Sequence, residues 1–532
     1  MFQQEELNLK AYKERQLYLK YIRRPDLPAE LRLYIAGVAL FESKYGQITE
    51  LSQRYKISRS FIYQLRNQLL MSGWVLFGMS PEKASSCEGK ITEELDLLRE
   101  ILSLRLEGRC SIIGISLLLK RKGLTGSSIG YISQVLKEIG TKLTPVIEEV
   151  SHLNLAVVFA SDEVFSSNRP LLITVDPVSS AILQMELGED RKSDSWQAHW
   201  QALLDAGFTP ILLTNDEGNG MKSAQKIVLE NIPRQSDTYH GVAHRLGDIC
   251  RILEQKAWAA AKEEYEREQK IASVVQEDKV EKRFEIYEQA VLNSKQAIGL
   301  YDDFKLYYQY MIAQFQLFDE HGDVRSAAKS KVNLEEAMDA LKSLGHKKAN
   351  VELKTIKNLM GDLFYFLNQA QKVVQQLEQA CTSEAQRKAL KTICVAYQHQ
   401  KNYRKIKQAS IKKYHRQKET QWLIIAQTKL EQDKEEETVD FKSFKSKCYQ
   451  QLDNIIQSSA LVETINSIVR MYLNGCKNQI SQPHLNLIMF YHNHRRYVQG
   501  KRKHHTPMEL LTGQSQEQDW LDLLLKRVGK AA

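Results

Sequence analysis

A succession of short β-rich runs, interrupted once by a helix-like run, constrains the fold of this chain more than any other feature. The order is strand, strand, strand, helix, strand. In chain order, these runs occupy residues 161–165, 171–176, 181–187, 194–207 and 210–214. Pro177, Ser179 and Ser180 give the second and third runs a turn between them. The pattern predicts an α/β sheet built from this part of the chain.

Two acidic residues accompany this pattern. Asp162 lies in the first strand, and Asp216 directly follows the fourth. If those strands are neighbours in one sheet, the two carboxylates can share a divalent metal. Mg²⁺ binds carboxylate oxygens, keeps several waters and completes its shell with substrate phosphate. Asp176 also ends a strand, but Pro177 beside it is typical of a turn, so Asp162 is the preferred first acid.

A third acid lies far along the chain. The run 459–473 is helix-like and contains Glu463, an aromatic-Asn-basic stretch follows at 487–496, and a Thr-Pro-x-Glu-Leu-Leu sequence begins at Thr506. This arrangement resembles the RNase H-like catalytic core of DDE transposases and retroviral-type integrases. The resemblance covers residues 150–245 and 455–513.

The resemblance implies that Asp162, Asp216 and Glu463 are a catalytic triad that binds two Mg²⁺ ions, with Mn²⁺ as a substitute. Such paired ions activate water or a DNA 3′-hydroxyl and stabilise the leaving oxygen of an in-line displacement. The implied function is a DNA transposase that binds terminal inverted repeats and target DNA as a homodimer or higher multimer. Asp237 and His240 match an Asp-x-x-His motif of such cores. His240 therefore either assists at the scissile phosphate or hydrogen-bonds a carboxylate.

Two other functions stay open. If the acids are turn, cap or surface residues, the chain is a catalytically inactive, sequence-specific DNA-binding regulator derived from a transposase. The other alternative is a nuclease relative that acts on RNA–DNA hybrids, which the two helical modules described next disfavour.

The N-terminal region resembles a helix-turn-helix module of the transposase and repressor type. We expect a helix at 31–41, a short one at 48–55 and a third that begins after Ser58. Ser58 caps this last helix, whose N-terminal residues meet base edges in the major groove. Its inward-packing residues are Ile57, Ile62 and Leu65. The residues left to contact DNA are Arg59, Ser60, Tyr63, Gln64 and Arg66.

A second helical module follows a Pro- and Gly-containing linker at 77–92. Its last helix, which begins near Ser127, repeats the capped, amphipathic pattern of a recognition helix. Two such modules would read a long DNA site in two pieces; the alternative is a packing domain beside the core. The DNA-contacting residues expected here are Ser128, Tyr131, Gln134 and Lys137.

The interval from 246 to 450 is rich in Glu, Lys, Gln, Ala and Leu and nearly without Gly and Pro. This composition predicts a long all-helical insertion, with a helix over 351–377 and another over 383–399. The expected breaks are Gly299, Gly322 and Gly345.

Basic residues gather in two segments, 401–418 within the insertion and 495–505 after Glu463. Cations with interleaved aromatics suit phosphate contact and stacking on an unpaired base, although a solvated basic face is the simpler reading. The candidate DNA-binding residues are Arg404, Lys405, Trp422, Arg495, Arg496, Lys501 and Arg502.

Composition bounds the remaining choices. The chain has 532 residues and a net charge of +9, which favours a polyanionic partner. No apolar run is long enough to cross a membrane, and the first residues do not resemble a signal peptide. Seven scattered cysteines argue for a reducing compartment and against a zinc site. We expect a cytoplasmic, nucleoid-associated protein.

The expected architecture is therefore mixed and multidomain. It combines all-α helix-turn-helix modules at the N-terminus, an α/β RNase H-like core and a large all-α insertion. The predicted parts are 1–76, 93–145, 150–245 (first part of the core), 246–450 (insertion), 451–513 (second part of the core) and 514–532 (tail helix).

Overall fold

The computed structural model describes residues 26–41, 46–76, 93–148, 150–215, 218–272, 277–431 and 440–529. The chain divides into two compact units, Met1–Thr92 and Glu93–Ala532. The predicted linker at 77–92 lies outside the described residues. Among the described helices, none combines the length and the apolar character that a bilayer span requires.

The first unit contains the three helices that the sequence predicts. They are α2 (Ala29–Phe41), α3 (Gln47–Arg54) and α4 (Arg59–Leu76). The Ser58 hydroxyl accepts a 3.2 Å hydrogen bond from the Phe61 N–H, as expected of a capping residue. Ile57, Ile62 and Leu65 are buried in one apolar core, so their inward packing is confirmed.

A five-stranded sheet lies at the centre of the second unit. Its strands are β1 (Ala156–Ser166), β2 (Arg169–Val175), β3 (Ile182–Leu187), β4 (Thr209–Asn215) and β5 (Arg234–Ser236). The spatial order is β3-β2-β1-β4-β5. The first three strands are antiparallel neighbours, whereas β4 and β5 add in parallel. The first and fourth predicted strands are therefore neighbours, the condition on which a metal shared by Asp162 and Asp216 depends.

Four helices complete the second unit near its C-terminus. They are α18 (Ala460–Gly475), α19 (Gln482–His494), α20 (Pro507–Thr512) and α21 (Trp520–Arg527). The Thr-Pro-x-Glu sequence forms a capping box at the start of α20, in which Thr506 and Glu509 bond to each other's backbone N–H. The tail helix α21 docks on the core, because Trp520 and Leu524 are buried there.

The two faces of the sheet are covered by different helices. Period-2 alternation sends Ala160 and Val164 of β1 into the core shared with α18 and α19. Phe159, which precedes Ala160, packs on the other face with Trp196 and Trp200 of α8 (Ser193–Asp205). Because Asp162 has the same parity as Ala160 and Val164, it lies on the α18 side.

Three helices precede the sheet: α5 (Glu93–Leu106), α6 (Ile112–Arg121) and α7 (Ile129–Thr141). They share one apolar core with the sheet, α18, α19 and α21. A Cβ on Gly140 would lie 2.0 Å from the Pro483 carbonyl oxygen, so α7 packs directly on the start of α19. The expected boundary between 145 and 150 therefore does not separate two apolar cores.

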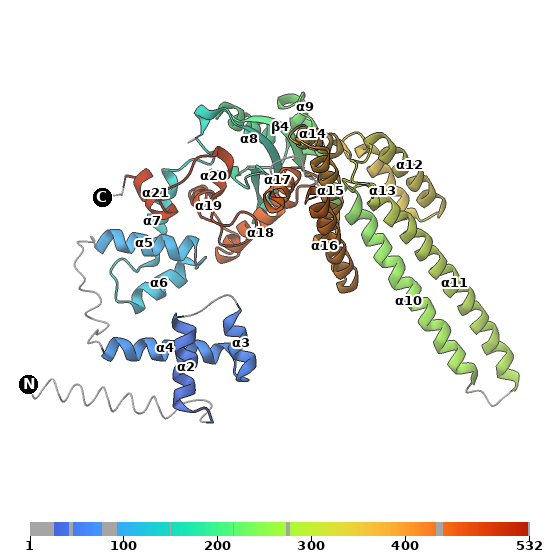
Figure 1. The fold of residues 1–532 in the computed structure, drawn as a ribbon, viewed down its shortest axis with the longest axis horizontal. Helices are drawn as coiled ribbons and strands as arrows, with labels where there is room; N and C mark the ends of the chain where they lie inside the picture. The colour runs from blue at the N-terminus through green and yellow to red at the C-terminus, as the bar shows by residue number, and fades with distance from the viewer. Residues whose placement is uncertain are drawn as a thin grey trace, which may run out of the picture. The chain divides into compact units, whose positions relative to one another are not determined.

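The interval between β5 and α18 is helical, as predicted. It contains α10 (His244–Ala272), α11 (Glu277–Ala313), α12 (Ala327–Ser343), α13 (Lys347–Leu359), α14 (Tyr365–Gln379), α15 (Glu384–Lys405), α16 (Ala409–Glu431) and α17 (Phe441–Asp453). The long helices α10 and α11 run side by side, as do α15 and α16 (Figure 1). The segment from α12 to α15 packs with α10 and α11 around a second apolar core.

Two details of the predicted insertion are wrong. Gly299 does not break a helix; it lies inside α11, where a Cβ would meet open space. The single helix expected over 351–377 is instead two helices, α13 and α14. The turn between them accepts hydrogen bonds from β5 through its backbone carbonyl groups. Ser236 N–H donates to the Asp362 carbonyl at 3.1 Å, and the Gln235 side chain donates to the Leu363 carbonyl at 3.0 Å.

Candidate metal centre and DNA-facing residues

The side chains of His240 and Glu463 are hydrogen-bonded through Nε2 and Oε1. His240 lies in η3, a π-helical turn (Tyr239–Ala243) that leads from β5 into α10, and Glu463 is in the first turn of α18. Both side chains are partly exposed, at 37% and 44%. The sequence predicts both residues for the site, and the fold brings them together across more than two hundred positions.

Asp237 fixes the two segments that carry this pair. Its carboxylate is 1% exposed and accepts four hydrogen bonds. Oδ1 accepts from the Tyr239 and His240 N–H groups at 2.6 and 3.0 Å, and Oδ2 accepts from the N–H and hydroxyl of Ser459 at 2.8 and 2.6 Å. Since Ser459 directly precedes α18, one buried carboxylate holds both the turn of His240 and the helix of Glu463.

Asp237, His240 and Glu463 together could hold a metal ion, because each offers a ligand atom and these atoms lie within 4.8 Å of one another. Carboxylates suit Mg²⁺ and Mn²⁺, and an imidazole suits transition metals. Both Asp237 oxygens already accept two hydrogen bonds, so Glu463 and His240 retain more capacity for a cation. The donor set fits Mn²⁺ at least as well as Mg²⁺.

Asp162 is linked to the same helix through Asn466. The Asn466 amide donates a 2.6 Å hydrogen bond to Asp162 Oδ2, and Oδ1 accepts from the Glu163 N–H at 2.8 Å. Asn466 is buried one turn after Glu463, and its own Oδ1 has no hydrogen-bond partner among the described residues. Through Asn466, the Asp162 carboxylate thus contacts the turn of α18 that follows Glu463.

Asp216 lies outside the described residues, but its neighbour does not. Asn215 ends β4 and pairs in register with Ser161 of β1. The chain therefore leaves β4 beside the strand that carries Asp162. Asn215 also accepts a 2.9 Å hydrogen bond from Arg234 of β5, which joins the two parallel strands at this end.

The rival first acid, Asp176, has a structural role. It is 3% exposed, and its Oδ2 accepts from the N–H and hydroxyl of Ser179 at 2.7 and 2.6 Å. Its Oδ1 accepts from the Val158 N–H at 3.2 Å. These bonds close the turn between β2 and β3, as Pro177 and the serines indicate.

The predicted DNA-contacting residues of α4 lie on its solvent side. Arg59, Ser60, Tyr63 and Gln64 are exposed, and Arg66 is half-buried with its guanidinium 5.1 Å from the Tyr63 ring centroid. These are the positions that a recognition helix offers to a DNA groove. Their contact with DNA stays a prediction.

On α7 the four predicted residues also form one exposed stripe. The Ser128 hydroxyl caps the helix by accepting a 3.2 Å hydrogen bond from the Tyr131 N–H. Tyr131, Gln134 and Lys137 follow at three-residue spacing and reach solvent. Gln134 donates to Glu138 at 2.8 Å, so its amide is engaged within the helix.

The basic run at 401–418 is not a single helix. Arg404 and Lys405 end α15, Lys407 lies in the turn at 406–408, and the cations from Lys412 to Lys418 belong to α16. Trp422 is half-buried on α16. The cations of this run are therefore divided between the end of α15 and the first half of α16.

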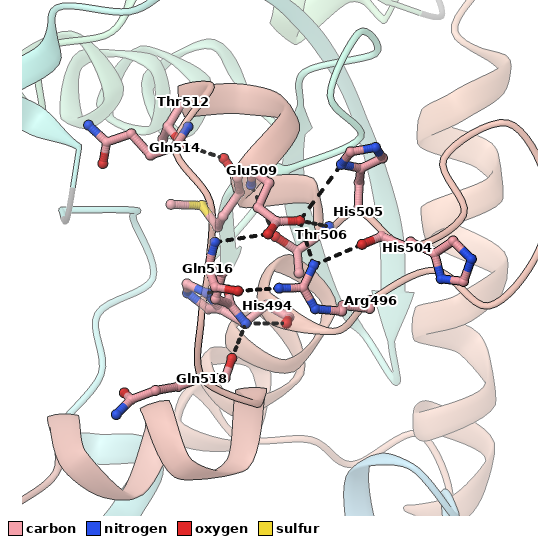
Figure 2. Close-up of polar contacts among 11 residues, drawn as sticks. His494, Arg496, His504, His505, Thr506, Glu509, Thr512, Gln514, Gln516 and Gln518 are labelled. Carbon is pink, nitrogen blue, oxygen red and sulfur yellow. Dashed lines mark hydrogen bonds and ion pairs between the residues drawn. The ribbon is translucent and has the colours of Figure 1, made fainter.

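Arg496 and Arg502, which follow α19, bond to other parts of the protein; Figure 2 shows the partners of Arg496. Arg496 donates to Glu509 Oε2 at 2.9 Å and to the His504 carbonyl at 2.8 Å, and it also bonds the Gln516 carbonyl. Arg502 donates to the carbonyls of Pro177 and Val178 at 3.0 and 3.1 Å. Arg496 and Arg502 thus stabilise this segment, whatever else they contact.

The two other predicted DNA-binding residues of this segment, Arg495 and Lys501, also have partners. The Arg495 guanidinium lies 5.6 Å from the Tyr491 ring centroid and 5.5 Å from that of Tyr497. Lys501 pairs with Asp453 at the end of α17. Lys501 is more exposed to solvent than Arg495.

Sequence reasoning missed Asn466 and the clamping role of Asp237. The spacing of Glu463 and Asn466 was a usable signal, because residues three apart on a helix lie on the same face. The role of Asp237 had no local signal, since its partner Ser459 is distant in sequence.

Comparison with known proteins adds no family to this picture. No model of a known protein family matches the chain, and no curated protein sequence matches it.

Proposed function

We propose that this chain is a DDE-type DNA transposase that cleaves and transfers DNA strands in a metal-dependent reaction. The observation that carries the proposal is the Asn466 hydrogen bond, which joins the Asp162 carboxylate to the helix of Glu463. An acid on the central strand and an acid on a helix from a distant segment then face one site. A sheet ordered β3-β2-β1-β4-β5, with three antiparallel strands followed by two parallel ones, supports an RNase H-like core.

In this proposal Asp162, Asp216 and Glu463 hold two Mg²⁺ or Mn²⁺ ions. When bound, such ions activate the attacking oxygen and stabilise the leaving one in an in-line displacement. Asn466 orients the Asp162 carboxylate, and Asp237 holds η3 and α18 at a fixed separation. His240 keeps Glu463 directed into the site by its hydrogen bond.

The same site accounts for cleavage and for strand transfer, because the two reactions differ only in the nucleophile, water or a DNA 3′-hydroxyl. The exposed residues of α4, with those of α7, are the proposed contacts to double-stranded DNA at the element ends. We propose a homodimer or higher multimer, since a transposase must pair two ends.

The test is cleavage of a supercoiled plasmid that carries the DNA flanking the gene, with Mg²⁺ or Mn²⁺. The variants are Asp162→Asn and Glu463→Gln, and the matched control is Asp205→Asn, an exposed acid at the end of α8. We expect cleavage by the parent and the control and a loss of at least 100-fold in both site variants. Equal cleavage by all four proteins would overturn the proposal.

Binding without cleavage is the third outcome. If the parent binds the flanking DNA but does not cut it under any metal, the chain acts as a DNA-binding regulator instead. Terminal inverted repeats bordered by short direct duplications at the gene would independently favour the transposase.

A further inference from the structure

Cations from two distant segments meet beside the proposed metal centre. Lys401, Arg404 and Lys405 occupy the last turns of α15, and Lys501 comes from the segment after α19. Lys501 pairs with Asp453, and the Tyr397 hydroxyl on α15 donates to the same carboxyl group at 2.9 Å. Tyr397 of α15 and Lys501 therefore contact the same acidic side chain, that of Asp453.

Hydrogen bonds connect this cluster to the metal centre. The Lys401 ammonium donates to Gln457 Oε1 at 2.7 Å. The Gln457 carbonyl accepts from the N–H and hydroxyl of Thr238 at 3.3 and 3.1 Å. Thr238 adjoins Asp237, and Ser459, two residues after Gln457, donates to Asp237. The last turns of α15 thus rest on the segments that carry His240 and Glu463.

The four cations of this cluster, Lys401, Arg404, Lys405 and Lys501, outnumber the two acids that act on them, Asp453 and Asp237. Lys405, Lys501 and Arg404 repel Lys401, whereas Asp453 attracts it, and Asp237 attracts Lys405. Burial, followed by the repulsion of Lys405, lowers the pKa of Lys401 to about 7. Gathering like charges is unfavourable unless an anion joins them.

The negative end of the α15 dipole explains only part of this arrangement. Basic residues in a last turn are favourable for any helix, and this accounts for Arg404 and Lys405. It does not account for Lys501, which reaches the cluster from another segment, or for the ammonium of Lys401 beneath the surface. Arg404 and Lys405 both reach solvent, so an external anion can approach them.

We infer that the end of α15 and Lys501 form a binding site for backbone phosphates of the DNA strand that enters the metal centre. This inference rests on the proposed function and deepens it. It assigns the helical insertion a direct part in holding the substrate, through Arg404, Lys405 and Lys501. Lys401, fixed by Gln457, sets the position of that last turn.

The first test uses matched pairs of residues on one helix. Arg404→Ala/Lys405→Ala removes an Arg-Lys pair at the end of α15, and Arg387→Ala/Lys388→Ala removes the same pair about 25 Å away along the axis. Each full-length protein is titrated with a 40-base-pair duplex at several salt concentrations. We expect the slope of log K against log salt to fall by about 0.9 for each lost phosphate contact in the first variant and to stay unchanged in the second.

A second test needs no variant and so does not depend on folding. Surface lysines of the parent protein are acetylated with and without the duplex, and each site is quantified by mass spectrometry. We expect DNA to protect Lys405 and Lys501 at least threefold and to leave Lys388 unchanged. Equal reactivity of Lys405 with and without DNA, together with an unchanged salt slope, would overturn the inference.

The result is separable from that of the proposed function. If Asp162→Asn abolishes cleavage while the end of α15 shows neither protection nor a slope change, the transposase proposal stands and this inference fails. If Asp162→Asn cleaves like the parent but Lys405 and Lys501 are protected, the phosphate site stands and the catalytic proposal fails.

Discussion

The side-chain amide of Asn466 donates a 2.6 Å hydrogen bond to the carboxylate of Asp162, which lies 304 positions earlier in the chain. This bond fastens the central strand to the helix that carries Glu463. We therefore expect Asn466→Ala to reduce metal-dependent cleavage about 10- to 100-fold, the usual effect of losing a residue that orients a ligand. Asn474→Ala, an exposed change on the same helix, is the control. Steady-state rates over a Mn²⁺ series measure the effect, and parental rates at every Mn²⁺ concentration would contradict it.

Asp237→Asn tests whether the buried Asp237 carboxylate joins η3 to α18 through its four hydrogen bonds. An amide nitrogen in place of one oxygen would face N–H or hydroxyl donors, since both oxygens accept two hydrogen bonds each. We expect a loss of about 2–4 kcal/mol in the free energy of unfolding, because bonds to a charged acceptor are lost and donors stay buried. Urea denaturation measures it. Asp205→Asn should change stability by less than about 0.5 kcal/mol, and an equal effect of the two changes would argue against the clamp.

Glu509 gives a pH-dependent prediction. Burial acts to raise its pKa, but the N–H groups of Gln516 and Thr506 and the guanidinium of Arg496 outweigh it, so the pKa is lowered from 4.5. A lowered carboxyl pKa contributes stability that is complete above pH 4.5 and is lost as the pH falls through the folded-state value. Glu509→Gln should therefore destabilise the protein at pH 7, by about 1–3 kcal/mol.

The difference in stability between parent and Glu509→Gln should shrink as the pH is lowered below 4.5. Chemical denaturation at pH 7, 5 and 3.5 measures this difference. Glu517→Gln, an exposed neighbour, is the control and should show no such trend. A difference that is constant across these pH values would mean that the charge of Glu509 does not contribute.

Two glycines of α7 make a matched pair. A Cβ at Gly140 would meet the Pro483 carbonyl oxygen at 2.0 Å, whereas a Cβ at Gly130 would meet nothing within 4 Å. We expect Gly140→Ala to cost about 1–3 kcal/mol, because α7 and α19 must move apart. Gly130→Ala should be neutral or slightly stabilising, since Ala favours a helix over Gly. Thermal unfolding of both variants measures the difference, and equal effects would refute the close packing of α7 on α19.

The succession of strands and helix along the chain and the long helical interval could be predicted because each depends on a local pattern. The runs around Asp162 have strand composition and turn residues between them, and the long interval lacks helix-breaking residues. The helix that contains Glu463 could be predicted from the run at 459–473, whereas the catalytic role of Glu463 rests on the resemblance and stays a prediction.

Tertiary contacts decided what the sequence did not reveal. Gly299 lies within a helix because one exposed glycine costs only about 1 kcal/mol there. The helix break between α13 and α14 occurs where Asp362 and Leu363 give their carbonyls to β5. Arg496, a predicted DNA-binding residue, also bonds Glu509 and the Gln516 carbonyl, and no local pattern indicates those partners.

The central claim is that acids from β1, from the end of β4 and from α18 share bound metal. The most direct test is to measure Mn²⁺ binding by calorimetry. The proteins compared are the parent, Asp162→Asn, Asp216→Asn and Glu463→Gln. We predict that the parent binds Mn²⁺ and that each of the three variants binds it at least tenfold more weakly, with Asp205→Asn unchanged. Parental Mn²⁺ affinity in all three variants would contradict the claim.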